Sequence, residues 1–223
     1  MADIVIDFHK GPPKIGLIVR GKQGPDHHPD KLAQHADTIL GDGSPEGFFG
    51  EGNDGSLNAL GLGMQGVVYD YALLRLHRAW YVDKASAVTN RVVSTVLLID
   101  VDQPTADKFK DAWDKMTTSP GDFNIVGGNC ATHASAAFIA AGVVSKTIPW
   151  MDTPDNLYQQ LVDNLPAGRV VSYTGYIGFK TNPSGGYDME ITPYVASPAV
   201  AAPNPGSSGS LSTAGGGGNS SSS

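Results

Sequence analysis

Runs of apolar and polar residues along the chain predict short strands separated by helices. Residues 4–8 and 14–21 are apolar and β-branched and are bounded by glycine and proline, which is typical of strands. Residues 91–101 predict a buried strand, and residues 168–180 predict a last β segment. Residues 35–52 contain two extended segments around a Gly-Asp-Gly-Ser-Pro turn, which indicates a hairpin.

Three segments have the apolar spacing of helices. Residues 103–116 carry a proline in the first turn and large apolar residues at helical intervals. A second helix is expected from Asn129 to Gly142, and a third over residues 153–165 begins with a threonine cap. Residues 66–79 fit a helix or a strand about equally, because their apolar positions are dense. The pattern as a whole predicts an α+β fold.

Length and composition favour one folded domain followed by a tail. The chain has 223 residues, and a single domain commonly contains roughly 150–200 residues. We expect that domain to occupy residues 1–195. In residues 196–223 proline, glycine and serine replace nearly all large apolar residues. Ordering such a segment costs backbone entropy without burial in return, so we expect a flexible tail.

The charge of the chain narrows the classes of partner. The formal net charge is −7, and lysine and arginine form no run. Nucleic acids demand clustered positive charge, so we do not expect a nucleic-acid partner. No stretch of about 20 apolar residues could span a bilayer, so no transmembrane segment is expected. The start lacks a basic region followed by an apolar one. We therefore expect a protein made in the cytoplasm without a signal peptide.

Cys130 is the only cysteine of the chain, so no intramolecular disulfide can form. Asn129 before it is a favoured N-cap, and the alanine-rich sequence after it favours a helix. At such a helix start, free N–H groups and the helix dipole stabilise a thiolate and can hold an oxyanion. The alternative is that Cys130 only packs, since free cysteine is among the most buried residue types.

The stretch "GGNCATHASAAFIAAGV" resembles the cysteine motif of the permuted papain-like hydrolases. It follows the strand–helix–loop "VVSTVLLIDVDQPTADKFKDAWDKM…FNIVGGNC", and a histidine opens a hairpin far upstream in "QHADTILGDG". This group is similar to the NlpC-type peptidoglycan hydrolases but has the histidine before the cysteine in the chain, as in the relatives of lecithin retinol acyltransferase, whose cysteine motif also begins Asn-Cys. The resemblance spans about residues 35–142. It implies a papain-like fold of permuted order, with an antiparallel sheet packed against the helix that carries the cysteine.

The resemblance implies that His35 is the base that activates Cys130. A third polar residue would orient its imidazole. If the hairpin turn is centred on Gly43, His35 lies opposite Glu51, which makes Glu51 the first candidate. Asp37 lies two residues after His35 on the same strand face and is the second candidate. The alternative for Glu51 is a solvated loop acid, because a slip of one residue would turn it away.

Two residues of the cysteine helix are candidates for substrate binding, namely Asn129 and His133. His133 follows Cys130 by about 300° of helical rotation, so the two side chains share a face. A partner on the same helix is poorly aimed for proton transfer, which favours a structural or substrate contact for His133. His27 and His28 lie in a Pro/Asp loop without metal-ligand spacing. We therefore expect neither a metal nor a cofactor.

These residues lead to the expectation of a cysteine peptidase or amidase that forms an acyl-enzyme. The resemblance implies an amide substrate in the peptide of bacterial cell wall. Together with the missing signal, it implies an antibacterial effector of a type VI secretion system. Such a toxin reaches the periplasm of a competitor, and an immunity protein protects the producer. Three alternatives remain: a lipid acyl hydrolase or acyltransferase, a protein deamidase with the same Cys-His site, and a non-enzymatic binding module with a structural cysteine.

Overall fold

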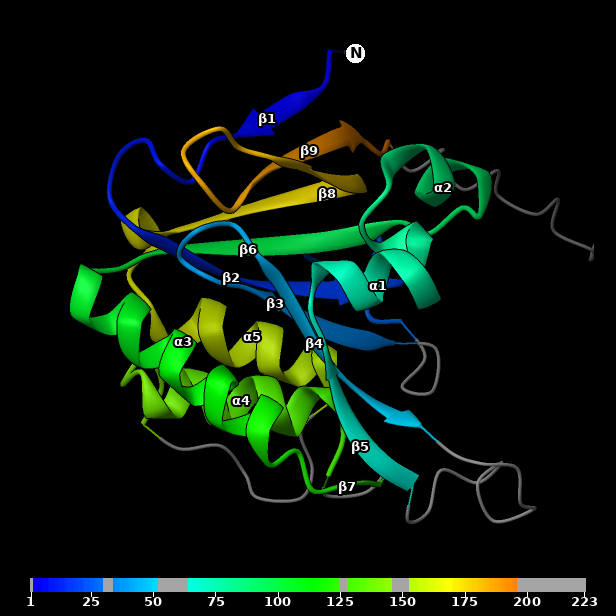
Figure 1. Cartoon of the computed structure of the whole chain (residues 1–223). Coiled ribbons are helices and arrows are strands. Elements are labelled where there is room, and N and C mark those ends of the chain that lie inside the picture. The colour runs from blue at the N-terminus through cyan, green and yellow to red at the C-terminus, as the bar shows by residue number, and fades with distance from the viewer. Residues whose placement is uncertain (1, 30–33, 52–63, 125–127, 146–152, 196–223) are drawn as a thin grey trace, which may run out of the picture.

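The computed structural model describes residues 2–29, 34–51, 64–124, 128–145 and 153–195. The predicted tail at residues 196–223 lies outside the described residues. The described part is α+β, as the sequence predicts, with helices packed on an antiparallel sheet (Figure 1). The strands are β1 (Ile4–Ile6), β2 (Lys14–Arg20), β3 (His35–Ile39), β4 (Pro45–Glu51), β5 (Met64–Tyr69), β6 (Ser94–Asp100), β7 (Asp122–Phe123), β8 (Val170–Thr181) and β9 (Tyr187–Pro193).

The nine described strands form one sheet in the order β1-β9-β8-β6-β2-β3-β4-β5-β7, and all neighbours are antiparallel. The described helices are α1 (Tyr71–His77), α2 (Lys84–Thr89), α3 (Gln103–Thr118), α4 (Cys130–Ala140) and α5 (Pro154–Asn164), with short 3-10 turns η3 (Ala79–Tyr81) and η4 (Ala167–Arg169). Figure 1 shows α3, α4 and α5 together on one side of the sheet and α1 and α2 on the other.

Residues of the central strands are buried on both faces, because helices cover each face. In β2, Leu17 and Val19 join the core beneath α3, α4 and α5, whereas Ile18 joins the core beneath α1 and η3. Successive side chains of a strand point to opposite faces, so a continuous apolar run suits a strand in this position. The strong apolar signal of β2 and β6 therefore reflects burial from two sides.

Two segments, residues 66–79 and the residues after 180, differ from the sequence expectation. The ambiguous residues 66–79 contain both elements, since β5 ends at Tyr69 and α1 begins after the cap Asp70, whose side chain accepts from the Leu73 N–H. The apolar pattern predicts no strand after residues 168–180, but β9 follows β8 and pairs with it. The polar residues of β9 concealed this second arm of the hairpin.

The register of the hairpin β3–β4 differs from the prediction. The described pairs include Asp37 with Gly47 and Ile39 with Pro45, which places the turn centre at Asp42 instead of Gly43. The Leu40 N–H donates to the Ser44 carbonyl and closes the loop at this position. A shift of the centre by one residue moves every cross-strand partner by two positions. Glu51 therefore does not lie opposite His35.

Candidate active site

Cys130 is the first residue of α4, as the sequence predicts. The Asn129 side chain accepts a hydrogen bond from the Thr132 N–H at 3.0 Å, and the Thr132 hydroxyl oxygen accepts from the Asn129 N–H at 2.8 Å. This reciprocal capping box fixes where the helix begins. The helix dipole is consequently directed at the Cys130 thiol, which is only 7% exposed.

The first turn of α4 lies beside the start of strand β3, which supplies a donor to this sulfur. The Ala36 N–H lies 3.4 Å from Cys130 Sγ and donates to it. Pairing between β3 and β4 ends at Asp37 and Gly47, so the strands diverge before they reach Ala36. The divergence leaves this N–H available to the thiol, and Figure 1 shows the two strands separating beside α4. A main-chain donor next to the sulfur favours the thiolate.

His35 lies at the start of β3, and its side chain, 14% exposed, interacts with the Cys130 thiol. Its Nε2 is 2.8 Å from Asp37 Oδ1. Since a carboxylate only accepts, Nε2 carries the hydrogen, and Nδ1 is the nitrogen left for the thiol. The imidazole is stacked on Phe49, with 4.2 Å between ring centroids, and lies beside Tyr81 at 5.6 Å. These rings restrict its rotation.

Asp37 is fully buried and is bound from both sides. Arg20 Nε donates to Asp37 Oδ2 at 2.7 Å, while His35 occupies the other oxygen. Arg20 is 3% exposed and lies directly across from His35 in the pairing of β2 with β3. Burial alone would raise the pKa of Asp37, but the Arg20 guanidinium and the His35 imidazolium outweigh it and lower that pKa. The carboxylate is therefore ionised.

The charges of these groups favour a thiolate–imidazolium pair. Burial raises the pKa of the Cys130 thiol, but the positive charge of His35 and the Ala36 N–H outweigh it, so that pKa lies below its usual value. Burial would lower the pKa of His35, whereas the negative charges of Cys130 and Asp37 raise it well above its usual range. Between the two pKa values the pair is charged, and a thiolate is the reactive form of cysteine.

Glu51 lies apart from this cluster. It is exposed at the end of β4, pairs across the sheet with Gln65, and accepts a hydrogen bond from the Tyr69 hydroxyl at 2.5 Å. Burial and the nearby Glu51 carboxylate raise the pKa of Tyr69 to about 12. The placement of Glu51 beside His35 was wrong because it depended on a turn centred at Gly43. The structure brings Asp37 to the imidazole instead.

Asn129 and His133 are both close to Cys130 in the chain, but their polar atoms contact the protein itself. The Asn129 side chain caps α4. The ring nitrogens of His133 face the carbonyl oxygens of Asn129 and Pro120 at 3.1 Å and 3.2 Å, and the ring is stacked on Phe48. Burial lowers the pKa of His133, although both carbonyls oppose it. These contacts indicate a structural role for His133, and its substrate contact stays a prediction.

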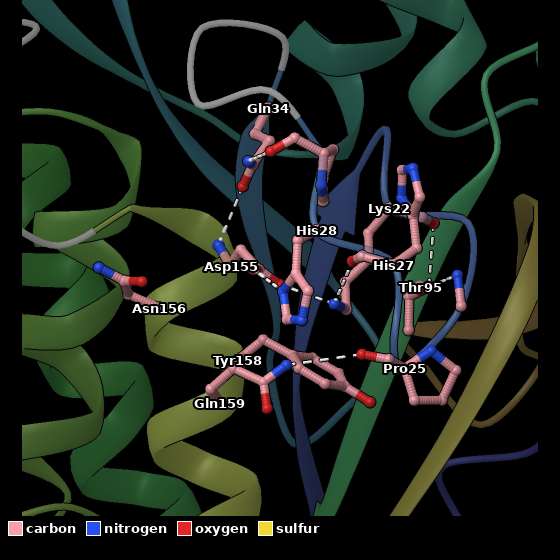
Figure 2. Close-up of polar contacts among 12 residues, drawn as sticks. Lys22, Pro25, His27, His28, Gln34, Thr95, Asp155, Asn156, Tyr158 and Gln159 are labelled. Carbon is pink, nitrogen blue, oxygen red and sulfur yellow. Dashed lines mark hydrogen bonds and ion pairs between the residues drawn. The ribbon is translucent and has the colours of Figure 1, made fainter.

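The connection from β2 to β3 is held by a second buried ion pair (Figure 2). Lys22 Nζ, completely buried, lies 2.7 Å from Asp155 Oδ1 and 4.7 Å from the centre of the Tyr158 ring. His28 Nδ1 lies 2.7 Å from Asp155 Oδ2. The Gln34 side-chain oxygen accepts from the Asp155 N–H at 3.0 Å. These contacts attach the residues on both sides of the 30–33 segment to α5, next to His35.

Sequence reasoning missed Arg20, Lys22 and the aromatic residues around His35. The available signal was a charged residue directly after the apolar run of β2, since an arginine that continues a buried strand needs a buried partner. Among the described residues, no group of three or more His, Cys, Asp or Glu side chains could hold a metal ion. No described helix has the length and apolar character needed to cross a membrane.

Comparisons with known proteins return no family model, no curated protein and no solved structure that matches this chain.

Proposed function

We propose that the protein is a cysteine hydrolase of the permuted papain-like kind, with Cys130 as nucleophile, His35 as acid and base, and Asp37 as the residue that orients His35. The observation that carries the proposal is the meeting of three groups at the start of α4. The thiol contacts His35 and the Ala36 N–H, and His35 contacts a buried carboxylate. The order of elements also fits, because the histidine strand precedes the cysteine helix and that helix packs on an antiparallel sheet.

The chemistry starts with attack of the Cys130 thiolate on the carbonyl carbon of an amide. A carbon–sulfur bond forms, and the carbonyl electrons move to the oxygen, which main-chain N–H groups at the start of α4 stabilise. The imidazolium of His35 gives its proton to the leaving nitrogen as the carbon–nitrogen bond breaks. His35 then removes a proton from water, which attacks the thioester and releases the acid and the thiolate.

We further propose that the amide belongs to the peptide of bacterial peptidoglycan. This choice rests on the resemblance of the cysteine motif to the NlpC-type hydrolases. Delivery by a type VI secretion system into the periplasm of a competitor, and a protective immunity protein, follow from the same resemblance. The acidic chain, with a net charge of −7, gives no electrostatic support for an anionic lipid surface as substrate.

The proposed activity is tested by mass spectrometry of purified peptidoglycan after incubation with the wild type and with Cys130→Ala. New fragments from the wild type alone would support a cysteine amidase, and their masses would name the bond. No cleavage by either protein, while a control hydrolase cleaves the same material, would contradict the peptidoglycan substrate. Phospholipid esters and protein glutamines would then be tested in the same way, with the same Cys130→Ala control.

A further inference from the structure

The buried carboxylate of Asp37 is held on one side by Arg20. In addition to the 2.7 Å contact with Asp37 Oδ2, Arg20 Nη2 donates to the Tyr81 carbonyl at 2.9 Å. The guanidinium also lies over the Tyr81 ring, 4.5 Å from its centroid. Tyr81 in turn lies beside the imidazole of His35. Arg20 therefore fixes both the carboxylate and one ring next to His35.

On its other side, the carboxylate occupies space that only a glycine leaves open. Gly47 lies opposite Asp37 in the pairing of β3 with β4. A Cβ atom at residue 47 would lie 2.3 Å from Asp37 Oδ1 and 2.8 Å from Phe49 Cε2. Asp37 Oδ1 is the oxygen that binds His35 Nε2, and Phe49 is the ring on which His35 stacks. A side chain at residue 47 would disturb both supports of the imidazole.

The backbone gives no other reason for a glycine at residue 47. Gly47 does not belong to the residues with positive φ, so any amino acid could adopt its strand conformation. Glycine weakens a strand interior, because it has no side chain to pack and more freedom to lose. The carboxylate cannot move aside without losing a contact, since Arg20 holds its second oxygen, His35 binds its first oxygen and the residue is completely buried.

We propose that Gly47 and Arg20 are positioning residues that together hold Asp37 against His35, Gly47 by leaving space and Arg20 by binding the second oxygen. Both act through Asp37 on the orientation of the imidazole. This role rests on the proposed function, because Asp37 and His35 are the residues that the proposed hydrolysis uses. It is tested on the thiol itself, without any substrate.

The first test replaces Gly47 with alanine and follows the alkylation of Cys130 by iodoacetamide as a function of pH. Because Cys130 is the only cysteine, the label reports a single site. In Gly47→Ala we expect the alkylation rate at pH 6 to fall about tenfold or more, while the rate above pH 9 stays closer to that of the wild type. Displacement of the carboxylate removes the anion that stabilises the imidazolium, so less thiolate exists at low pH.

Gly50→Ala is the matched control. It lies on the same strand, and its Cβ would also collide, but with Met64 Cε at 2.4 Å and Phe123 Cδ1 at 2.8 Å instead of a carboxylate. We expect this variant to be less stable than the wild type and to keep the wild-type pH profile. Equal changes of the profile in Gly47→Ala and Gly50→Ala would overturn the role of Gly47, because they would indicate a general response to crowding.

The combination of Gly47→Ala with Asp37→Ala tests whether the effect passes through the carboxylate. Without the carboxylate, the methyl group at residue 47 no longer meets Oδ1. The contact with Phe49 Cε2 remains, so we expect the methyl group to lower the alkylation rate at pH 6 much less in the Asp37→Ala background than in the wild type, a non-additive result. If the methyl group slowed alkylation at pH 6 by the same factor in both backgrounds, Gly47 would not act through Asp37.

For Arg20, Met and Lys substitutions separate charge from geometry. Arg20→Met removes the partner of a buried carboxylate, and we expect a loss of alkylation rate at pH 6 of about tenfold. Arg20→Lys keeps the charge without the planar fork, so we expect partial recovery of the rate. Circular dichroism shows whether Arg20→Met is folded. If the folded variant has the wild-type pH profile of alkylation, the role of Arg20 is overturned. If Arg20→Met does not fold, Arg20→Lys decides, and an unchanged profile there overturns the need for the fork.

These outcomes are distinguishable from failure of the proposed hydrolysis. If Gly47→Ala changes the thiol profile but the wild type cleaves no substrate, the positioning role stands and the proposed function fails. If the wild type cleaves peptidoglycan and Gly47→Ala has the same cleavage rate and thiol profile, only the positioning role fails.

Discussion

Two aspartates of this protein each connect a buried cation with a histidine, and the two clusters have different surroundings. In one, Asp37 binds Arg20 and His35, and His35 contacts the Cys130 thiol. In the other, Asp155 binds Lys22 and His28, with Tyr158 beneath the lysine (Figure 2). The two cations, Arg20 and Lys22, are two residues apart in the chain. Each belongs to a cluster of a buried cation, an aspartate and a histidine.

The surroundings of the two histidines explain why only one cluster is a candidate catalytic site. The His35 side chain is 14% exposed and lies against Phe49 and Tyr81, whereas the His28 side chain is 66% exposed. An exposed ion pair is screened by water and contributes little, while a buried imidazole responds strongly to its neighbours. An Asp–His pair thus has catalytic potential only where burial and a nucleophile accompany it.

The largest expected difference between the clusters is seen when each histidine is replaced with alanine. His35→Ala removes the proton donor and acceptor of the proposed reaction, so we expect hydrolysis to fall by roughly 10³-fold or more. His28→Ala should leave the rate within about twofold, because His28 contacts no group of the Cys130 cluster. The measurement is the cleavage rate at fixed protein concentration. Equal losses in both variants would contradict the assignment of His35.

The two aspartates should affect different properties. We expect replacement of Asp155 to change mainly the stability of the fold, and replacement of Asp37 to change mainly the reactivity of the Cys130 thiol. In Asp155→Asn the completely buried Lys22 loses its carboxylate, and we expect the free energy of unfolding to fall by about 3 kcal/mol. The pH profile of Cys130 alkylation should not change. In Asp37→Asn we expect a narrower pH range in which the thiolate–imidazolium pair exists, because the His35 imidazolium loses the anion that raises its pKa. Urea denaturation and alkylation measure the two effects, and a changed thiol profile in Asp155→Asn would remove the distinction between the clusters.

A third carboxyl shows what happens without a buried cation. Burial and the carboxylates of Asp70, Asp114 and Asp42 raise the pKa of Glu46 to about 8. A folded-state pKa above the unfolded value for an acid means that stability falls as the pH rises from about 4.5 to about 8. Glu46→Gln removes that penalty, and we expect a relative gain of about 2 kcal/mol at pH 9 over pH 5. Denaturation at both pH values tests this, and no pH-dependent gain would contradict it.

The smallest expected effect concerns the loss of stability at acid pH. Asp37 and Asp155 both have lowered pKa values, Asp37 through Arg20 and His35 and Asp155 through Lys22 and His28, although burial opposes both shifts. The stability that they add is present above about pH 4 and is lost as the pH falls through their folded-state pKa values. We expect each Asp→Asn variant to lose less stability than the wild type between pH 4 and pH 2. In this respect the two variants should be alike, although they should differ in their effect on the alkylation of Cys130. Denaturation over this range provides the measurement, and an unchanged slope in either variant would contradict the lowered pKa.

Local signals predicted the parts of the site that depend on a few neighbouring residues. The cap at Asn129 and the alanine-rich run after it placed Cys130 at the start of α4, because capping chemistry is contained in three or four residues. Asp37 could be placed with His35 on one strand face, because alternation along a strand needs no tertiary information. The strand runs of β2 and β6 were evident because both their faces are buried.

The missed parts depend on contacts between distant segments. The choice of Glu51 failed because the turn of the hairpin is centred on Asp42, and a hairpin register is set by hydrogen bonds such as that from Leu40 to Ser44. Arg20 was missed since its partner, Asp37, lies on another strand. The space that Gly47 leaves for the carboxylate is visible only when both strands are paired. Sequence periodicity contains none of this information.

The most direct test of the Cys130–His35 pair is a pH titration of the ultraviolet absorbance of the thiolate, taken as the difference between the wild type and Cys130→Ala. The same titration is performed with His35→Ala as background, and it needs no substrate and no access of a reagent to the buried sulfur. An ordinary cysteine titrates at about pH 8.5. We predict that the wild-type thiolate persists below that pH, because the pKa of Cys130 is lowered, and that His35→Ala moves its appearance to that pH or higher. Identical titrations near or above pH 8.5 in both backgrounds would show that Cys130 is a packing residue and would contradict the proposed catalytic pair.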